Sequence, residues 1–165
     1  MTEKQRKELL RSQQGEIDAV GMYQALADAV GRQPDADTFR RLAAEEGRHG
    51  SIFKSYTGEP LKPKRFKAVL LPALYRLLGR ERLYPLIARG EYSAAKGYAH
   101  LVPDFPEVES VLNDENRHGD TVMELLEQAE CQPKKDGTHW KTAAAAACVL
   151  SAAGALVCVM NKRRK

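Results

Sequence analysis

The amino-acid sequence predicts an all-α protein: a four-helix bundle with a long crossover segment between its second and third helices, followed by a C-terminal transmembrane helix. Three observations predict this fold class. Ala, Leu, Arg and Glu dominate long stretches of the 165 residues, which favours helix over strand. Apolar residues recur at the helical period in four segments of similar length. An uncharged segment near the end of the chain has the length that a bilayer requires.

The four expected bundle helices share an apolar stripe and are separated by segments that contain Gly or Pro. They span residues 3–30, 35–56, 81–101 and 104–130. Helices of similar length that each carry one apolar stripe bury those stripes by packing together. Residues 1–132 are therefore predicted to form the bundle domain.

Residues 61–79 fall outside these helices, at the place where the bundle needs a crossover. Their first residues are basic, and those from Ala68 onward are strongly apolar. Two interpretations stay open. The segment is either a crossover helix packed on the bundle or an interfacial helix lying on a membrane.

A linker at 133–141 leads to residues 142–160, a run of nineteen residues without a charge. As a helix this run would reach about 28 Å, close to the hydrocarbon thickness of a bilayer. Trp140 and basic residues flank it, the last of them in the tail at 161–165. We expect a single-pass transmembrane anchor rather than a buried helix, because a complete bundle leaves the run nothing to bury against. The polar N-terminus lacks the apolar core of a signal peptide, so we expect the bundle on the cytoplasmic side.

Composition and cysteine spacing narrow the classes of partner and metal site. The three cysteines, Cys131, Cys148 and Cys158, include no C-x-x-C pair, so neither a cysteine-bound iron centre nor a zinc knuckle can form locally. The net charge is +4, with basic residues crowded in the middle of the chain and at its end. Such clusters suit nucleic acid or anionic lipid. We expect membrane lipid as a partner and no nucleic acid, and we leave a homodimer open.

Two histidines stand in matching sequence contexts. The second helix contains Glu46-Gly-Arg-His49-Gly, and the fourth contains Glu115-Asn-Arg-His118-Gly. A Glu and a His three residues apart lie on one face of a helix, so both side chains can point at one metal ion. A single pair of this kind is usually a surface pair. Two copies on alternate helices, sharing the Arg and the Gly, indicate a metal site.

The first and third helices carry a second repeat. Each copy reads Gly-Glu-x-x-Ala, with a Tyr seven residues after the Glu: Gly15, Glu16, Ala19 and Tyr23, then Gly90, Glu91, Ala94 and Tyr98. The chain therefore reads as two helix pairs related by an approximate two-fold axis. Glu16 and Glu91 are flanked by apolar residues, where an uncompensated carboxylate would be very costly.

This inventory amounts to four carboxylates and two imidazoles in the core of a bundle. Hard oxygen ligands with two nitrogens suit iron or manganese. Bridging carboxylates can hold two such ions close together, and carboxylate sites in bundle cores are built from this set of residues. Zinc would usually take fewer carboxylates and more His or Cys.

The motifs resemble those of the rubrerythrin and ferritin-like di-iron carboxylate superfamily, and most of all its membrane-attached, erythrin-type branch. The resemblance covers roughly residues 5–130. It implies a ferritin-like bundle that holds two iron ions, with manganese as the alternative metal. The six implied ligands are Glu16, Glu46, His49, Glu91, Glu115 and His118. Among them, Glu46 and Glu115 would bridge the ions.

The resemblance also assigns the two tyrosines to the catalytic site. Tyr23 and Tyr98 would each hydrogen-bond a ligand carboxylate in the opposite helix pair. From the two-fold relation we expect Tyr23 near Glu115 and Tyr98 near Glu46. The alternative for either tyrosine is a packed core aromatic.

Two departures from the family pattern bear on the reaction. Rubrerythrins usually carry a further Glu where this chain has Ala94, and the chain shows no cysteine-bound iron module. We expect an oxidoreductase that oxidises ferrous iron with oxygen or hydrogen peroxide, closer to a ferroxidase than to a peroxidase, in iron homeostasis or oxidative-stress defence. Electrons would come from ferrous iron, from an external protein donor or from a membrane carrier. The alternatives are a membrane-tethered iron or redox sensor or adaptor, and a quinone-linked di-iron hydroxylase.

Other polar residues near the motifs receive lesser roles. Asp114 is placed to orient a histidine, whereas Glu45 is expected at a rim that faces solvent. Arg48 and Arg117 are expected to form surface or inter-helix ion pairs. The two remaining histidines lack partners at ligand spacing and are expected to be structural or exposed: His100 and His139.

Overall fold

The computed structural model describes residues 1–130, so the linker, transmembrane helix and basic tail predicted at 133–165 lie outside the described residues. Residues 1–130 form five helices and no strand: α1 (Glu3–Val30), α2 (Asp35–Thr57), α3 (Phe66–Leu78), α4 (Arg80–Tyr98) and α5 (Val108–Glu130). The prediction of an all-helical protein is confirmed for this part of the chain. Within it, no helix has the length and apolar character needed to cross a bilayer.

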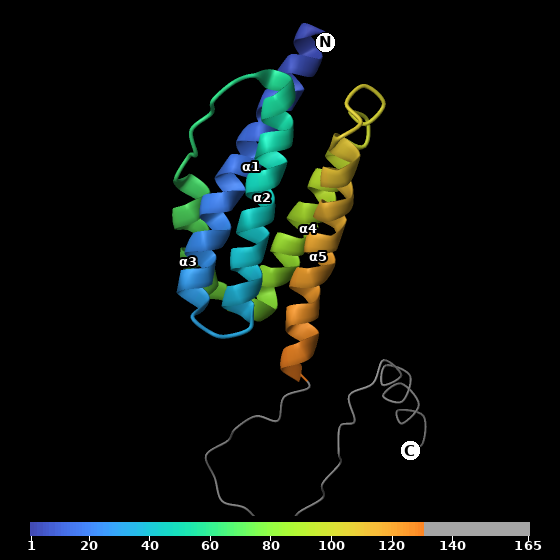
Figure 1. Ribbon diagram of the computed structural model, residues 1–165. Helices are drawn as coiled ribbons and strands as arrows, with labels where there is room; N and C mark the ends of the chain where they lie inside the picture. Colours follow the sequence, from blue (N-terminus) through green and yellow to red (C-terminus); the bar gives the residue numbers. More distant parts are fainter. Residues whose placement is uncertain (131–165) are drawn as a thin grey trace, which may run out of the picture. The chain divides into compact units, whose positions relative to one another are not determined.

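Two helix hairpins make up the bundle. α1 pairs with α2, α4 pairs with α5, and the hairpins meet where α2 packs on α5 (Figure 1). The segment between α2 and α3 runs back along the bundle, so α2 and α4 point the same way (Figure 1). α3 packs on α1, as the crossover-helix interpretation of residues 61–79 requires.

The ends of α1 and α2 follow from local sequence. The Thr2 side chain caps α1 by accepting a hydrogen bond from Gln5 N at 3.2 Å, and the Gln5 side chain accepts one from Thr2 N at 2.7 Å. Gly31 and Gly58 follow α1 and α2 with φ of 63° and 70°, left-handed values that favour glycine. The predicted bounds of the first helix are confirmed, and those of the second differ by one residue.

The turn between α4 and α5 is longer than predicted. α4 ends at Tyr98 rather than at residue 101, and α5 begins at Val108 rather than near residue 104. Buried Leu101 and Phe105 anchor the turn, and the Leu101 carbonyl accepts hydrogen bonds from the backbone N–H groups of residues 104 and 105 at 3.1 and 2.9 Å. Apolar spacing extended both helices in the prediction because it cannot separate a buried turn residue from a helical one.

Buried polar side chains of α1 fix the start of the crossover. Asp18 accepts hydrogen bonds at 2.7 Å from the Lys64 backbone N–H and at 2.7 Å from the Gln14 side chain. Gln13, which is fully buried, donates to the Glu59 carbonyl at 2.8 Å. These bonds hold the segment before α3 against α1.

Two hydrophobic clusters lie on either side of a polar layer in the bundle. One is built around Tyr23, Phe39 and Tyr84, and the other around Leu9, Phe53 and Phe105. On each of the four bundle helices, the buried acidic residue and its neighbours fall in sequence between the two clusters. Well-packed aromatic clusters at both ends therefore hold the polar layer in place.

Candidate metal centre

Four side chains form the middle of the polar layer. Glu46 and His49 come from α2, and Glu115 and His118 from α5; each offers one ligand atom, and these atoms lie within 4.8 Å of one another. All four residues are buried, with at most 2% of their surface exposed. The two imidazole rings stack with centroids 5.3 Å apart and planes at 22°. This group of two Glu and two His could hold a metal ion.

Each imidazole turns its Nδ1 atom toward the carboxylates. Nδ1 of His49 lies 3.1 Å from Oε1 of Glu115, and Nδ1 of His118 lies 3.1 Å from Oε1 of Glu46. The carboxylate on the same helix lies at 3.6 Å in the first case and 4.0 Å in the second. Glu46 and Glu115 are therefore each close to both histidines.

The other ring nitrogen of each histidine meets a second carboxylate. Nε2 of His49 lies 3.1 Å from Oδ2 of Asp114, and Nε2 of His118 lies 2.7 Å from Oε2 of Glu45. A carboxylate only accepts hydrogen bonds, so Nε2 carries a proton, and Nδ1 can present a lone pair to a metal once its own proton has left. The role predicted for Asp114 as an orienting acceptor agrees with this geometry.

Glu45 is partly exposed, as expected of a rim residue, but its contact with His118 was not predicted. Its carboxylate also pairs with Arg117 at 2.9 Å and with Arg48 at 3.3 Å. Partial burial opposes ionisation, but His118 and Arg117 outweigh it and lower the pKa of Glu45. The sequence did contain a signal for this role, because Glu45 precedes Glu46 as Asp114 precedes Glu115.

The two lone glutamates of the second repeat lie beside the same centre. Oε2 of Glu16 is 3.7 Å from Nδ1 of His49, and Oε2 of Glu91 is 3.9 Å from Nδ1 of His118. Both residues are buried, at 3% and 8% exposure. The structure therefore gathers all six predicted ligand residues around one buried point.

The tyrosines reach across the bundle, but to other partners than predicted. Tyr23 donates a hydrogen bond to Glu91 rather than lying at Glu115, and Tyr98 donates to Glu16 rather than lying at Glu46. Each phenol thus binds the lone glutamate of the opposite helix pair. Helical spacing gives the face on which a tyrosine lies, but not which carboxylate that face meets.

Burial and carboxylate neighbours keep both phenols protonated. Burial, followed by the charge of Glu91, raises the pKa of Tyr23 well above its ordinary value. Burial and the charge of Glu16 likewise raise the pKa of Tyr98. Both tyrosines therefore act as hydrogen-bond donors across the neutral pH range.

Unpartnered atoms test whether a cation fits this centre. Among the residues that the structure describes, six buried side-chain N or O atoms have no hydrogen-bond partner. Two belong to Arg80. The other four are Oε1 of Glu46, Nδ1 of His49, Oε1 of Glu115 and Nδ1 of His118, whose 3.1 Å contacts with one another lack hydrogen-bond geometry. A buried polar atom without a partner costs about 1–3 kcal/mol. A bound cation would satisfy all four atoms, which are two carboxylate oxygens and two imidazole nitrogens.

Protons compensate part of the buried charge in the metal-free centre. Burial raises the pKa of Glu46 well above its ordinary value and that of Glu115 to about 9, with nearby carboxylates adding to the effect. Burial alone would lower the pKa of His49, but Glu115, Glu16 and Glu46 outweigh it and raise the pKa to about 12. For Glu16, burial is outweighed by hydrogen-bonding neighbours that lower its pKa.

The remaining histidines are separate from the centre or outside the described residues. His100 is exposed, and its Nε2 lies 3.1 Å from Oε2 of Glu8. The prediction for His100 is confirmed, and His139 lies outside residues 1–130.

Comparisons with protein-family models, with curated proteins and with solved structures find no match to this chain. The resemblance to rubrerythrins therefore depends on the two repeated motifs and on the geometry of this centre.

Proposed function

We propose that the chain is a ferritin-like di-iron protein of the rubrerythrin kind, which oxidises ferrous iron with oxygen or hydrogen peroxide. Its ligands would be Glu16, Glu46, His49, Glu91, Glu115 and His118, with manganese as the alternative metal. Glu46 and Glu115 would be shared between the ions. The observation that carries the proposal is the set of four buried ligand atoms that lack any hydrogen-bond partner.

Each group around the centre has a role in this proposal. Bound iron supplies the electrons that reduce the oxidant. The four glutamates balance the charge of two divalent ions in a buried site, where unpaired charge is very costly. Tyr23 and Tyr98 hold Glu91 and Glu16 in position through their hydroxyl groups.

Ala94 supports iron oxidation rather than repeated peroxide turnover. It stands where rubrerythrins usually carry an additional glutamate, so this centre lacks that carboxylate. The external electron donor, if the reaction uses one, would be a protein or a membrane carrier.

Metal analysis and rapid kinetics test the proposal. Full-length protein purified without oxygen should bind two ferrous ions per chain, and a Glu46→Ala/Glu115→Ala variant should lose at least one. The exposed Glu109 gives a control, because Glu109→Ala should bind as the unchanged protein does. A double variant that still binds two ions would show that the ligand assignment is wrong.

Turnover separates an enzyme from a sensor. In stopped-flow absorbance, an oxidase should oxidise successive additions of ferrous iron when oxygen or peroxide is present. An iron or redox sensor would react once and stop.

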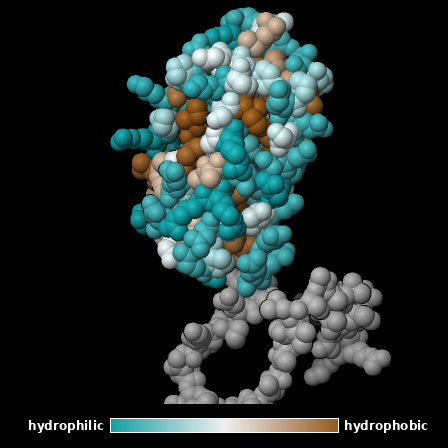
Figure 2. Space-filling view, in the orientation of Figure 1, coloured by the Kyte–Doolittle hydropathy of each residue, from teal (hydrophilic) through white to brown (hydrophobic). Residues whose placement is uncertain are grey.

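We also propose that the protein is attached to a membrane, with the bundle on the cytoplasmic side. Residues 142–160 carry no charge, and α3 exposes Phe66, Val69 and Leu77 at 73%, 70% and 78%. On the face in Figure 2, hydrophobic residues reach the surface in patches among hydrophilic ones. Fractionation tests this: if full-length protein stays soluble without detergent, and removing residues 136–165 changes nothing, the membrane proposal fails.

A further inference from the structure

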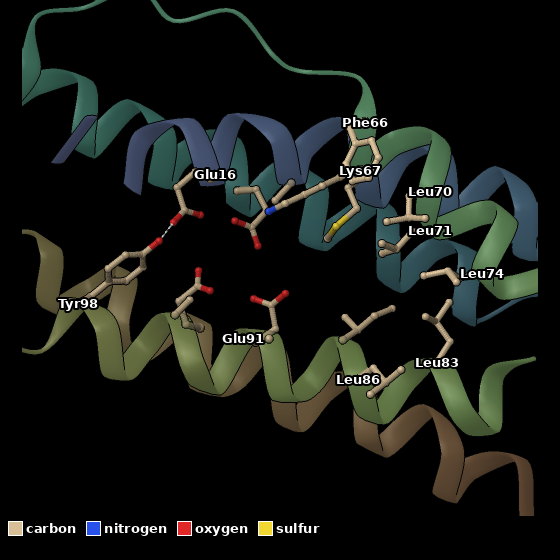
Figure 3. Close-up of a pocket in the computed structure, with 18 residues that line it drawn as sticks. Glu16, Phe66, Lys67, Leu70, Leu71, Leu74, Leu83, Leu86, Glu91 and Tyr98 are labelled. Carbon is tan, nitrogen blue, oxygen red and sulfur yellow. Dashed lines mark hydrogen bonds between the residues drawn. The ribbon is translucent and has the colours of Figure 1, made fainter. Parts of the chain in front are cut away.

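A cavity of about 470 Å³ opens beside the metal centre, between α1, α3 and α4. It has two unlike halves (Figure 3). One half ends at carboxylates of the centre, including Glu16 and Glu91. The other half is walled by aliphatic side chains: Leu70, Leu71, Leu74, Leu83 and Leu86.

Small residues of the second repeat make room for the cavity. Gly15 and Ala19 line it from α1, and Gly90 and Ala94 line it from α4. A Cβ atom added at Gly15 or Gly90 would meet no heavy atom within 4 Å. The residues that flank each lone glutamate therefore leave space next to the carboxylates.

The cavity is larger than the oxidant requires. A water molecule needs roughly 15 Å³ on a comparable measure, and oxygen and hydrogen peroxide each contain only two oxygen atoms. About 470 Å³ falls instead within the range of roughly 300–1,000 Å³ that is typical of sites for organic ligands. Iron oxidation alone gives no reason for this space.

The lining indicates the kind of molecule that fits. Phe66 and Leu86 line the cavity and are also 73% and 56% exposed, so it reaches the surface between apolar side chains. The carboxylates at the inner end disfavour an anion. Lys67 extends from α3 toward that end, where its amino group can donate a hydrogen bond (Figure 3).

We propose that this cavity binds a neutral amphiphilic molecule, with its apolar body among the leucines and a small hydrogen-bond acceptor, such as a carbonyl or hydroxyl group, near Lys67 and the carboxylates. The proposal goes beyond iron oxidation and does not depend on it, because the apolar walls of the cavity are formed by residues other than the proposed ligands.

A neutral fluorescent ketone, 6-propionyl-2-dimethylaminonaphthalene, serves as the probe. Titrated into full-length metal-free protein, it should show saturable binding with a shift of its emission to shorter wavelength. Gly90→Leu should weaken this binding at least tenfold, because the new side chain enters the cavity without a clash at its Cβ atom. Gly97→Leu is the matched control: it lies in the same helix, a Cβ there also meets nothing within 4 Å, and it does not line the cavity.

Every outcome of this titration tests whether the cavity is a ligand site. Any of three results would overturn the proposal. The unchanged protein and Gly90→Leu could bind the ketone equally well, Gly90→Leu and Gly97→Leu could lose the same affinity, or no protein could show saturable binding. The anionic probe 1-anilinonaphthalene-8-sulfonate should bind at least tenfold more weakly than the ketone, and equal affinities would overturn the preference for a neutral molecule. Iron binding, measured on the same proteins, reports separately on the proposed function.

Discussion

At the scale of single residues, the acidic side chain that precedes each shared glutamate is part of the centre. Asp114 on α5 holds the histidine of α2, and Glu45 on α2 holds the histidine of α5. These contacts keep a proton on Nε2 of each histidine, and they also tie the two hairpins together. The candidate centre therefore includes Glu45 and Asp114 as well as the buried Glu and His residues.

Removing the charge of either orienting residue should weaken metal binding. We expect Glu45→Gln and Asp114→Asn each to lower iron affinity about tenfold or more, because the histidine loses its fixed tautomer and orientation. Competition with a chelator under anaerobic conditions measures the change. Glu124→Gln, which alters an exposed residue of α5, serves as the control. Affinities equal to the control in both variants would show that the outer carboxylates do not position the ligands.

At the scale of elements, glycines after each histidine let the helices of a hairpin approach closely. A Cβ atom at Gly50 would lie 3.3 Å from Ile17 and 3.7 Å from Glu16, and one at Gly119 would lie 2.4 Å from the ring of Tyr92. This approach brings each lone glutamate next to the histidine of its partner helix. The shared Gly of the first repeat, which the sequence shows without a reason, is explained by packing.

A methyl group at the closest of these contacts should destabilise the bundle. Gly119→Ala would displace Tyr92, whose hydroxyl donates to Asp120 at 2.7 Å, and should cost about 1–3 kcal/mol of unfolding free energy. In contrast, Gly90→Ala meets no atom within 4 Å and should gain about 0.5–1 kcal/mol from helix propensity. Urea unfolding of the metal-free proteins measures both. A Gly119→Ala protein as stable as Gly90→Ala would contradict the close packing of α4 on α5.

The same scale explains which parts of the fold and site the sequence could predict. The end of α1 was predicted because Gly31 marks it, and the two motif repeats identified six side chains that the structure places near one another. The turn around Leu101 and Phe105 was missed, because buried turn residues continue the apolar pattern of a helix. Residue spacing within one helix does not show how two helices pack together. The sequence therefore could not predict the partners of Tyr23 and Tyr98 or the cavity beside α3.

At the scale of the whole molecule, the bundle buries several carboxylates at one point and must compensate their charge. The aromatic clusters at both ends hold Glu46 and Glu115 in place, so the metal-free protein retains protons at the centre. Burial, together with the nearby carboxylates, raises the pKa of Glu115 from 4.5 to about 9. A cation and these protons therefore compete for the same oxygen atoms.

Because metal and protons compete, iron binding should release protons and strengthen as pH rises from 6 to 8. Calorimetry in two buffers of different ionisation enthalpy measures the number released, and a value of zero would contradict the raised pKa values.

In contrast to iron binding, the stability of the metal-free protein should decrease as the pH rises. A carboxyl group whose pKa is higher in the folded than in the unfolded chain stabilises the folded state at low pH, and this contribution is lost as pH rises from about 4.5 to about 9. The metal-free protein should therefore unfold at lower temperature at pH 9 than at pH 5, and added iron or manganese should reduce the difference. Glu115→Gln keeps a neutral side chain at every pH, so its melting temperature should fall less over this range. If metal-free Glu115→Gln lost as much stability as the unchanged protein, the pH dependence would have to come from groups other than Glu115.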